Sequence, residues 1–549
     1  MTEKTNFPEE YLEIIDLIEN TENNIFITGG AGTGKSTLLK YIVEHTQKKC
    51  VVLAPTGVAA INANGQTIHS FFRFPITLFD KKSIKADNMK KELFESLQMM
   101  IIDEISMVRV DILDAVDCAL QINRQNSKPF GGVQMVFVGD VFQLPPVLTA
   151  QDNDYIFTNY KSHYFFDAPV LQKTDYQLKE LTNIFRQDAS EREFKETLNR
   201  IRIGETTDND IRLLNSRMTN IVNNDDTIYL TTRREIATDI NSKKLNNLPV
   251  SSIKYKGLII DAFDAGDGNK INEDKLPAPY ELELKKGAQI MLLRNDKSGR
   301  WVNGTIGIIQ ELKETSISVL INRKLHSVEK ETWEQIEYKY NITENKIEKQ
   351  IIGKYVQYPL QLAYAITIHK SQGMTFDKIN IDIGQGAFTH GQVYVALSRC
   401  KTLNGIKLNS RIDETDIIVD PKVLYWYKSK INPDYKPNND ELQRADLEKM
   451  FITRLSEALD IMDKQYNYQP TILKKMVSQL GVRNAIRKLV NTPDPPKGLQ
   501  ILKNKGALNL SMEALILDDK WKDLFEEVDK ENARKRLLQL GFDYRNQSS

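Results

Sequence analysis

The stretch from Asn24 to Lys40, NIFITGGAGTGKSTLLK, constrains the fold more than any other part of the chain. An apolar run over Ile25–Ile27 stops at Gly29, and a helical pattern begins after Ser36. Between them lies the pattern G-x-x-x-x-G-K-S, in the strand-to-helix context that a phosphate-binding loop requires. Glycines let backbone N–H groups surround phosphate oxygens, and the positive end of the next helix points at the same place. The sequence therefore predicts a nucleoside triphosphate site.

Two side chains of this loop have specific tasks in phosphate chemistry. Lys35 can reach the terminal phosphates, and the Ser36 hydroxyl can hold Mg²⁺. A glycine-rich turn with a chance Lys-Ser pair is the alternative, but the flanking strand and helix favour a phosphate loop. We expect contacts to ATP along the whole loop, at Gly29, Gly30, Ala31, Gly32, Thr33, Gly34, Lys35 and Ser36.

Three further apolar runs have the character of buried strands, at Cys50–Ala54, Leu97–Asp103 and Gln134–Gly139. Helical patterns separate some of these runs, and polar residues follow each of them, which predicts a parallel α/β sheet. Ligands of such sheets bind outside the carboxyl ends of the strands. The glycine loop, Thr56, Asp103 and Asp140 all fall at such ends, so we expect them to gather at one edge of the sheet.

An acidic pair and a glutamine at these strand ends suit the hydrolysis of a phosphate bond. Asp103 would hold Mg²⁺ through water, and Glu104 would orient and deprotonate the attacking water. Gln143, in GDVFQLPPV, can touch both the γ-phosphate and a moving neighbour, which suits a sensor. The alternatives are a solvated acidic turn and a rigid turn with a surface glutamine.

Two arginines in the later part of the chain are candidate arginine fingers. Arg186 lies in LTNIFRQ, and Arg399 lies in GQVYVALSR. A guanidinium that reaches the γ-phosphate from a second domain stabilises the charge of the transition state. Either residue could instead be an ordinary partner in a surface salt bridge.

Candidate nucleic-acid contacts are less distinctive. Donors that suit phosphate oxygens occur at Thr56, Thr67, His69, Thr232, His369, Lys370 and Ser371. Phe71 and Phe72 could stack on bases or wedge between them, although two adjacent phenylalanines are usually core residues. As single residues these are more often packing or surface positions, and they gain weight only because they fall at consecutive strand ends.

The rest of the chain divides by pattern. A second α/β unit begins near Gln177, with a clear strand at Asp226–Leu230. Residues 287–358 are rich in strands and glycines, which predicts a small inserted β-barrel. NPDYKPNN, residues 432–439, has the composition of a linker, and Glu441–Phe542 has helical periodicity without a chemical motif.

Composition restricts the class of protein. The 549 residues carry 74 Lys and Arg and 74 Asp and Glu, so any basic track for nucleic acid must be local. Cys50, Cys118 and Cys400 are isolated, which excludes a cysteine metal cluster or a disulfide framework and fits a reducing cytosol. Neither a signal-peptide pattern at the start nor a membrane-length apolar run is visible, so we expect a cytoplasmic, bacterial-type protein without a membrane partner.

Eight motifs in order carry a resemblance to a known family: GGAGTGKS, LAPTGVAA, TIHSFF, IIDEISM, GDVFQLPPV, LTNIFRQ, AITIHKSQGMTFD and GQVYVALSRC. Together they resemble superfamily 1 helicases of the B subclass, most of all the Pif family (petite integration frequency), which is close to the RecD branch. Residues 193–204, EFKETLNRIRIG, also resemble the signature helix of that family. The resemblance covers about residues 10–425 and leaves Glu441–Ser549 unexplained.

The resemblance implies two RecA-like domains in tandem with ATP between them. The boundaries that we expect are residues 1–175 for the first domain, with a wedge insertion at about 67–97, and 176–290 with 359–430 for the second. An SH3-like β-barrel would occupy 291–358, a linker 431–440 and a helical accessory module 441–549. This module is a candidate for binding a protein partner or DNA, or for a stabilising cap, with an accessory interaction role slightly favoured.

The resemblance also implies an activity: ATP- and Mg²⁺-dependent translocation from 5′ to 3′ on single-stranded DNA, with unwinding of duplex or forked DNA. Members of the family commonly act on forks, RNA–DNA hybrids and G-quadruplexes, in DNA repair, replication and telomere maintenance. On the matching motifs it adds Thr37, Gly373 and Asp377 to the ATP contacts, which include Gln143, Arg186 and Arg399, and it adds Gly57 to the DNA contacts.

One departure from the family pattern concerns the nucleotide base. Such helicases usually place a Gln before the phosphate loop to read adenine, but here the first Gln is Gln47, and Tyr11 occupies that place. Two other functions stay open from the residues alone. One is a nucleotide-gated clamp that grips single strands without unwinding, and the other is an ATPase that acts on RNA or protein, because contacts to a phosphate backbone distinguish sugars poorly.

Overall fold

The protein is described here from a computed structural model. The structure describes residues 8–542, apart from 76–78, 149, 188–190, 219–226, 268–269, 385, 388, 433, 436–438, 471, 474–475, 478–481 and 493–494. The chain forms two compact units, residues 1–147 with 156–423 and residues 148–155 with 424–549. Each unit is described by itself.

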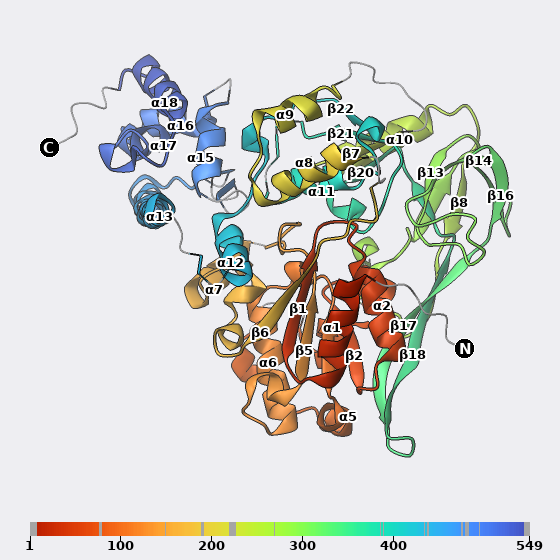
Figure 1. The fold of residues 1–549 in the computed structure, drawn as a ribbon. Coiled ribbons are helices and arrows are strands. Elements are labelled where there is room, and N and C mark those ends of the chain that lie inside the picture. Colours follow the sequence, from red (N-terminus) through yellow and green to blue (C-terminus); the bar gives the residue numbers. More distant parts are fainter. Residues whose placement is uncertain are drawn as a thin grey trace. The chain divides into compact units, whose positions relative to one another are not determined.

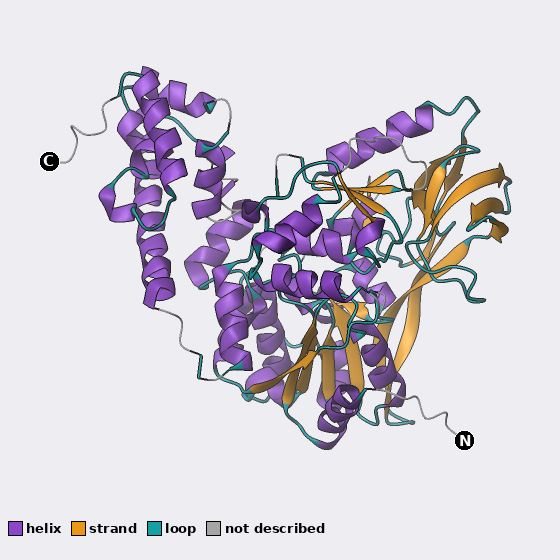
Figure 2. Cartoon of the chain, turned by 45° about the horizontal axis from the view of Figure 1, so that its top comes forward, coloured by secondary structure: helices purple, strands orange, loops and turns teal. Residues whose placement is uncertain are grey.

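A six-stranded parallel sheet forms the first part of the larger unit (Figure 1). Its strand order is β3-β2-β4-β5-β1-β6. The strands are β1 (Asn24–Gly29), β2 (Cys50–Ala54), β3 (Gln66–Thr67), β4 (Met99–Ile102), β5 (Gln134–Val138) and β6 (Tyr176–Leu181). Figure 2 shows these strands side by side with helices packed around them. The predicted parallel α/β architecture is confirmed, since every neighbouring pair of this sheet runs parallel.

The predicted start of the second domain at residue 176 is wrong. Strand β6 pairs with β1 over six residues, from Asn24 with Tyr176 to Gly29 with Leu181, and so completes the first sheet. The reason is that β6 is an edge strand. Only Leu181 of its six residues is fully buried, so the strand lacks the continuous apolar run of an interior parallel strand.

Three helices of the first part begin after a threonine or a glycine. Helix α2 (Lys35–His45) starts after Gly34, α3 (Gly57–Asn62) is capped by the Thr56 side chain, and α4 (Ile68–Phe72) is capped by Thr67. Helices α1 (Glu9–Asn20) and α6 (Val110–Arg124) complete this part. The excursion predicted at about 67–97 contains α4, two short turns and α5 (Lys91–Ser96), and residues 76–78 within it lie outside the described part.

A second parallel sheet lies in the same unit. Its four strands run in the order β20-β7-β21-β22. They are β7 (Ile228–Thr231), β20 (Ala365–Thr367), β21 (Ile379–Asp382) and β22 (Ile406–Leu408). The strand predicted at Asp226–Leu230 corresponds to β7, although Asp226 lies outside the described residues. Helices α8 (Arg192–Ile203), α10 (Arg234–Asn246) and α11 (Gln392–Ser398) belong to this part, and every residue of α11 is buried.

Between β7 and β20 the chain forms antiparallel strands, as predicted, but over a wider range. One sheet has the order β16-β15-β14-β13-β19, with β13 at Gln289–Leu292, β14 at Ile306–Leu312, β15 at Ile317–Ile321, β16 at Lys324–Val328 and β19 at Leu360–Leu362. Antiparallel pairing already occurs before the predicted lower boundary at residue 291, because β8 (Ile253–Lys256) pairs with β12 (Glu281–Leu284) in a separate two-stranded sheet. Closure into an SH3-like barrel stays a prediction.

Two long strands, β17 (Glu331–Asn341) and β18 (Lys346–Gln357), form a hairpin that reaches the first sheet (Figure 1). The Tyr338 hydroxyl accepts a hydrogen bond from Val52 N at 3.0 Å, and Lys90 Nζ lies 3.0 Å from Glu337 Oε1. Strand β18 also pairs with β9 (Leu258–Asp261). The hairpin therefore ties the antiparallel region to the first parallel sheet.

The smaller unit is helical, as predicted for residues 441–549. Its helices include α13 (Asn439–Tyr466), α15 (Val482–Val490), α16 (Lys497–Asn504), α17 (Met512–Leu515) and α18 (Glu527–Gln539). They enclose a core of their own around Phe451 and Trp521. The predicted linker at 432–439 lies partly outside the described residues. Among the residues described, no helix combines the length and the apolar character that crossing a membrane requires.

Candidate active site

The glycine loop joins β1 to α2, as its sequence predicts, and its glycines are required by geometry. Gly32 and Gly34 have φ of +85° and +83°, in the left-handed region that favours glycine. A Cβ on Gly34 would lie 2.0 Å from the Tyr11 hydroxyl oxygen, and a Cβ on Gly32 would lie 2.3 Å from Cβ of Arg186. The loop is therefore packed between α1 and the segment after β6.

Lys35 lies at the centre of the loop. Its Nζ donates hydrogen bonds to Gly29 O at 2.7 Å and to Gly30 O at 3.1 Å. Burial lowers the pKa of Lys35, while Asp140 and Glu104 oppose that shift. A buried ammonium held by two neutral carbonyl oxygens has a strong preference for an anionic partner. A phosphate is such a partner.

Asp103 and Glu104 follow β4 at the same edge of the sheet, as predicted. Glu104 N donates to Asp103 Oδ1 at 2.9 Å. Burial, with the Glu104 carboxylate second, raises the pKa of Asp103 to about 7. Burial also raises the pKa of Glu104, whereas Lys35 and Arg399 lower it. A buried carboxylate with a raised pKa is suited to accept a proton near neutral pH.

Asp140 follows β5 and is fully buried. Several hydrogen bonds converge on its carboxylate. It accepts hydrogen bonds from Arg202 Nε at 3.1 Å, from Phe142 N at 3.2 Å and from the Tyr394 hydroxyl at 3.1 Å. Burial alone would raise the pKa of Asp140, but Arg202 and Lys35 outweigh it and hold the pKa below its usual value. Gln143 is also buried, with Nε2 3.4 Å from Asp140 Oδ2.

The two predicted arginine fingers lie close together. Arg186 Nη1 donates to Ser398 O at 3.3 Å, and Arg399, only 1% exposed, donates through Nη2 to Ser398 Oγ at 2.9 Å. Burial and the neighbouring Arg186 lower the pKa of Arg399 to about 9. In the described part of the chain, neither guanidinium forms an ion pair with a carboxylate. Arg399 is buried, Arg186 is half-buried, and neutral oxygens accept the hydrogen bonds of both guanidinium groups, so an anionic phosphate beside them would be favourable.

Two residues that the sequence did not single out, Tyr394 of α11 and Arg202 of α8, contact the glycine loop and Asp140. Ala31 N donates to the Tyr394 hydroxyl of α11 at 2.7 Å, across 363 positions of sequence. Arg202 of α8 joins Asp140 to Glu180 of β6, with Nη1 2.8 Å from Glu180 Oε1. Both residues lie inside quoted motifs, GQVYVALSRC and the signature helix. Their motif membership is the signal that could have identified them.

Tyr11 lies against the loop, in agreement with its proposed place before it. Its hydroxyl donates to Thr33 O at 2.8 Å, and its ring meets Phe185 edge-on with centroids 6.5 Å apart. Phe185 is 59% exposed although it lies directly beside Arg186, and Phe185 N donates to Gly32 O at 2.8 Å. Phe185 lies inside the motif LTNIFRQ, but that motif does not indicate a role for its ring.

The candidate nucleic-acid residues do not all have free side chains. Phe71 is fully buried and packs against Phe94 and Tyr338, so its predicted stacking on bases is wrong for this conformation. Ser371 is also fully buried, and its hydroxyl donates to Ile368 O at 2.7 Å, which removes it as a contact. The Phe71 ring is thus part of the core, and the Ser371 hydroxyl stabilises its own turn.

The remaining candidates are distributed as follows. Thr56 and Thr67 use their hydroxyls as helix caps at the carboxyl ends of β2 and β3. Lys370 is exposed, Thr232 is 8% exposed, and Gly57, His69, Phe72 and His369 are half-buried. Burial lowers the pKa of both histidines, so they are neutral hydrogen-bonding groups at neutral pH.

Two predicted ATP contacts lie at the surface. The carboxylate of Asp377 is 76% exposed and lies 2.8 Å from Lys401 Nζ. Gly373 has φ of +76°, and a Cβ there would meet open space. Thr37 and Ser36 are exposed in the first turn of α2, next to the loop. The structure thus places Ser36 and Thr37 at the phosphate loop, and it assigns Asp377 an ion-pair partner instead.

The oxygen ligands expected for Mg²⁺ fit that ion. The Ser36 hydroxyl is accessible at the start of α2, and Asp103 carries a carboxylate whose pKa burial raises, so a cation beside it would be favourable. Mg²⁺ is usually held by one or two protein oxygens together with phosphate oxygens and water. The described residues contain no cluster of three or more acidic, histidine or cysteine side chains for a metal, which is consistent with such a shared site.

Comparisons with known proteins agree with this arrangement. A family model described as PIF1-like helicase matches residues 7–212, and one described as DNA helicase Pif1, 2B domain matches residues 268–312. The ATP-dependent DNA helicase Pif1 of Bdellovibrio bacteriovorus is 33% identical over 432 residues, which cover 76% of this chain and 91% of that protein. The PIF1 helicase of Xenopus laevis is also 33% identical, over 418 residues, and the match spans 61% of its length.

A solved structure is also similar. The crystal structure of Bacteroides sp Pif1 in complex with ADP-AlF4 is 40% identical in sequence, with a TM-score of 0.71. The similarity covers 78% of this chain and 97% of that one. Neither family model reaches the helical unit after residue 423.

Proposed function

This chain belongs to the Pif1 family of ATP-dependent DNA helicases, and from that premise we propose that it moves from 5′ to 3′ along single-stranded DNA and unwinds duplex and forked DNA. The direction of movement is carried by the motif resemblance alone. The observation that carries the motor assignment is a contact at the phosphate loop between the two α/β parts of the larger unit, where Ala31 of the loop donates a hydrogen bond to Tyr394 of α11.

We assign ATP to the loop from Gly29 to Ser36, with Lys35 on the terminal phosphates. Glu104 takes the proton of the attacking water, because burial raises the pKa of its carboxyl group and so makes the carboxylate a stronger base. Arg186 and Arg399 stabilise the charge that develops on the transferred phosphoryl group. Gln143 reports that group's presence to its neighbours.

Ser36 and Asp103 would hold Mg²⁺, which supplies neutralisation of phosphate charge when it is bound. Asp140 takes a different role from the acidic pair. Its carboxylate already accepts hydrogen bonds from Arg202, Phe142 and Tyr394. It therefore fixes the positions of these residues relative to one another and does not bind the ion.

The proposed DNA track follows the carboxyl ends of β2, β3, β7 and β20. It comprises Thr56, Gly57, Thr67, His69, Phe72, Thr232, His369 and Lys370. Phe71 and Ser371 are left out because they are buried. One solved Bacteroides relative is described as bound to single-stranded DNA, which supports this partner for the family.

Tyr11 stands where the family usually has an adenine-reading Gln, and its hydroxyl is already bonded to Thr33 O. We therefore expect weak discrimination between adenine and other bases, so GTP should also support turnover. We also propose that the protein acts on RNA–DNA hybrids and G-quadruplexes in genome maintenance. The helical unit is proposed to bind a protein partner. The wedge and the SH3-like barrel remain part of the proposal.

The test of the motor assignment is ATP turnover with and without single strands. The protein should hydrolyse ATP slowly alone and many times faster with a DNA oligonucleotide, whereas Lys35→Ala should be inactive in both conditions. An RNA oligonucleotide of the same sequence is the matched comparison. Equal stimulation by RNA would remove DNA as the assigned substrate, and turnover without any response to nucleic acid would defeat the motor assignment.

A further inference from the structure

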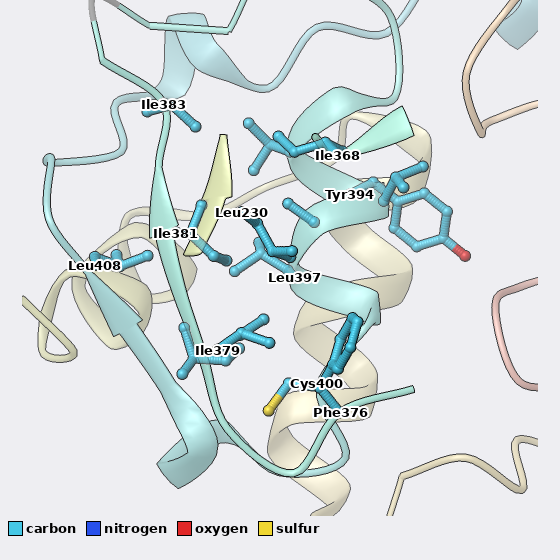
Figure 3. Close-up of a cluster of buried hydrophobic side chains, with 14 of the residues drawn as sticks. Leu230, Ile368, Phe376, Ile379, Ile381, Ile383, Tyr394, Leu397, Cys400 and Leu408 are labelled. Atoms are coloured by element: carbon cyan, nitrogen blue, oxygen red, sulfur yellow. The ribbon is translucent and has the colours of Figure 1, made fainter. Parts of the chain in front are cut away.

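The hydroxyl of Tyr394 contacts the phosphate loop in a way that the catalytic roles above do not use. The hydroxyl oxygen accepts a hydrogen bond from Ala31 N–H at 2.7 Å, and the hydroxyl O–H donates one to Asp140 Oδ2 at 3.1 Å. The residue is 4% exposed. Figure 3 shows its ring at the edge of the apolar cluster of the second sheet, with the hydroxyl pointing away from Leu230 and Ile381.

The same peptide unit of the loop is held from both sides. Lys35 Nζ donates to Gly30 O at 3.1 Å, and the N–H of that Gly30–Ala31 peptide donates to Tyr394. The two groups point in opposite directions because the peptide is trans. A Cβ on Gly30 would lie 3.3 Å from the Tyr394 hydroxyl oxygen, so this oxygen lies against the loop backbone itself.

The helix that carries Tyr394 also contacts residues 141–142, which precede Gln143, and it leads directly to Arg399. At its start, Gly391 has φ of +70°, and a Cβ there would lie 2.3 Å from Phe142 O. His390, just before it, has Nε2 2.9 Å from Val141 O. At its end, α11 runs directly into Arg399, whose Nε donates to Val395 O at 2.9 Å. One short helix therefore links Tyr394 to the Arg399 guanidinium.

The proton of the Tyr394 hydroxyl has a fixed direction. Burial and the nearby Asp140 carboxylate raise the pKa of Tyr394. The hydroxyl therefore keeps its proton and donates it to Asp140, which leaves the oxygen lone pairs for the Ala31 N–H. In this orientation the phenol oxygen is an acceptor presented to the loop.

We propose that Tyr394 is a positioning residue whose hydroxyl oxygen holds the place of a phosphate oxygen at the Ala31 N–H, so that an entering triphosphate displaces it and shifts α11 with Arg399. The proposal rests on the proposed function in one respect, that this loop binds ATP. Backbone N–H groups of such loops surround phosphates, and an anionic phosphate oxygen is a stronger acceptor than a phenol. Nucleotide entry thus reaches the second sheet through one hydrogen bond.

The test is Tyr394→Phe in the full chain, compared with Tyr164→Phe as the matched control. Tyr164 is also 4% exposed, and its hydroxyl also donates to a carboxylate, that of Asp420, at 2.7 Å. No contact described for Tyr164 reaches the loop. The probe is a fluorescent, non-hydrolysable triphosphate analogue of ATP, titrated with Mg²⁺ and without DNA. Steady-state kcat and KM for ATP are measured in parallel.

We expect Tyr394→Phe to bind the analogue about two- to tenfold more tightly than the wild type, since no hydroxyl competes for the Ala31 N–H. Its kcat should fall, because filling the loop no longer shifts Arg399. Tyr164→Phe should leave the affinity unchanged. Equal or weaker binding by Tyr394→Phe would overturn the proposal, because a purely structural hydroxyl predicts one of those outcomes.

If Tyr394→Phe does not fold, 3-fluorotyrosine at position 394 serves instead. The fluorine makes the hydroxyl oxygen a poorer acceptor while the ring and the hydroxyl remain, so binding of the analogue should again tighten, and unchanged affinity contradicts the proposal. The titration contains no DNA. A wild type that binds the analogue but ignores single strands would therefore defeat the motor assignment alone, whereas one that fails to bind it would defeat both.

Discussion

Replacing Arg399 by Ala tests whether the second sheet completes the active site. Arg399 is 1% exposed, and the structure holds its guanidinium by Val395 O and Ser398 Oγ beside a second guanidinium, that of Arg186. Such a charge is useful only if an anion develops next to it. Removing an arginine finger lowers kcat by about 10³- to 10⁵-fold, which corresponds to roughly 4–7 kcal/mol of transition-state stabilisation.

The kinetic pattern distinguishes this role from a structural one. Because the charge acts mainly in the transition state, kcat should fall while KM for ATP changes little. Burial and the positive charge of Arg186 both lower the pKa of Arg399. The substitution removes the repulsion between these two guanidinium groups, which partly offsets the stability lost with the packing of the side chain. The assay is DNA-stimulated ATP turnover, with thermal unfolding as the check on folding.

The matched control is Arg192→Ala on α8. Its side chain is 88% exposed and pairs with Glu196 one turn away, so turnover should stay near the wild-type value. A folded Arg399→Ala variant that retains more than a tenth of the wild-type kcat would refute the reasoning. Its buried guanidinium would then serve packing rather than phosphate.

The other predictions concern the loop and its acidic partners. Lys35→Ala should abolish turnover, measured by phosphate release, and substantial activity would mean that the loop is misassigned. Glu104→Gln should bind the nucleotide analogue but not hydrolyse ATP, since the amide cannot act as a base; loss of binding would indicate a structural role. Gly34→Ala should unfold at a lower temperature, because its Cβ would lie 2.0 Å from the Tyr11 hydroxyl, and a second change, Tyr11→Phe, should restore part of the loss; no restoration would contradict the packing argument. Asp103 has a pKa of about 7 in the fold and binds its proton more tightly there than when unfolded, so its contribution to stability falls as pH rises from about 4 to 7. Asp103→Asn should therefore gain thermal stability relative to the wild type at pH 8 compared with pH 5, and a pH-independent difference would contradict the shift.

The sequence predicts the local parts of this site well. The loop from Gly29 to Ser36 and the pair at Asp103 follow strongly apolar interior strands, and their positions depend on a few neighbouring residues. Parallel strands then bring their carboxyl ends together without further information. This is why the loop, the acidic pair and Gln143 lie at one edge of the sheet, as predicted.

The failures have a common physical cause, which is dependence on distant partners. Strand β6 contains Lys179 and Glu180 and lacks a continuous apolar run, so its sequence does not show that it pairs with β1 in the first sheet. The aromatic ring of Phe71 is of the kind that stacks on bases, but it is fully buried against Phe94 and Tyr338. Tyr394 and Ala31 are 363 positions apart, so their hydrogen bond has no local signature.

The central claim, that closure of the second sheet over ATP drives movement along DNA, is tested most directly by unwinding. Two forked duplexes of equal length, one with a 5′ single-stranded tail and one with a 3′ tail, are incubated with the protein, ATP and Mg²⁺, and strand separation is followed by fluorescence. We expect separation of the 5′-tailed duplex, little of the 3′-tailed one, and none with Arg399→Ala. Stimulated ATP turnover without separation of either duplex would contradict it and leave a nucleotide-gated clamp.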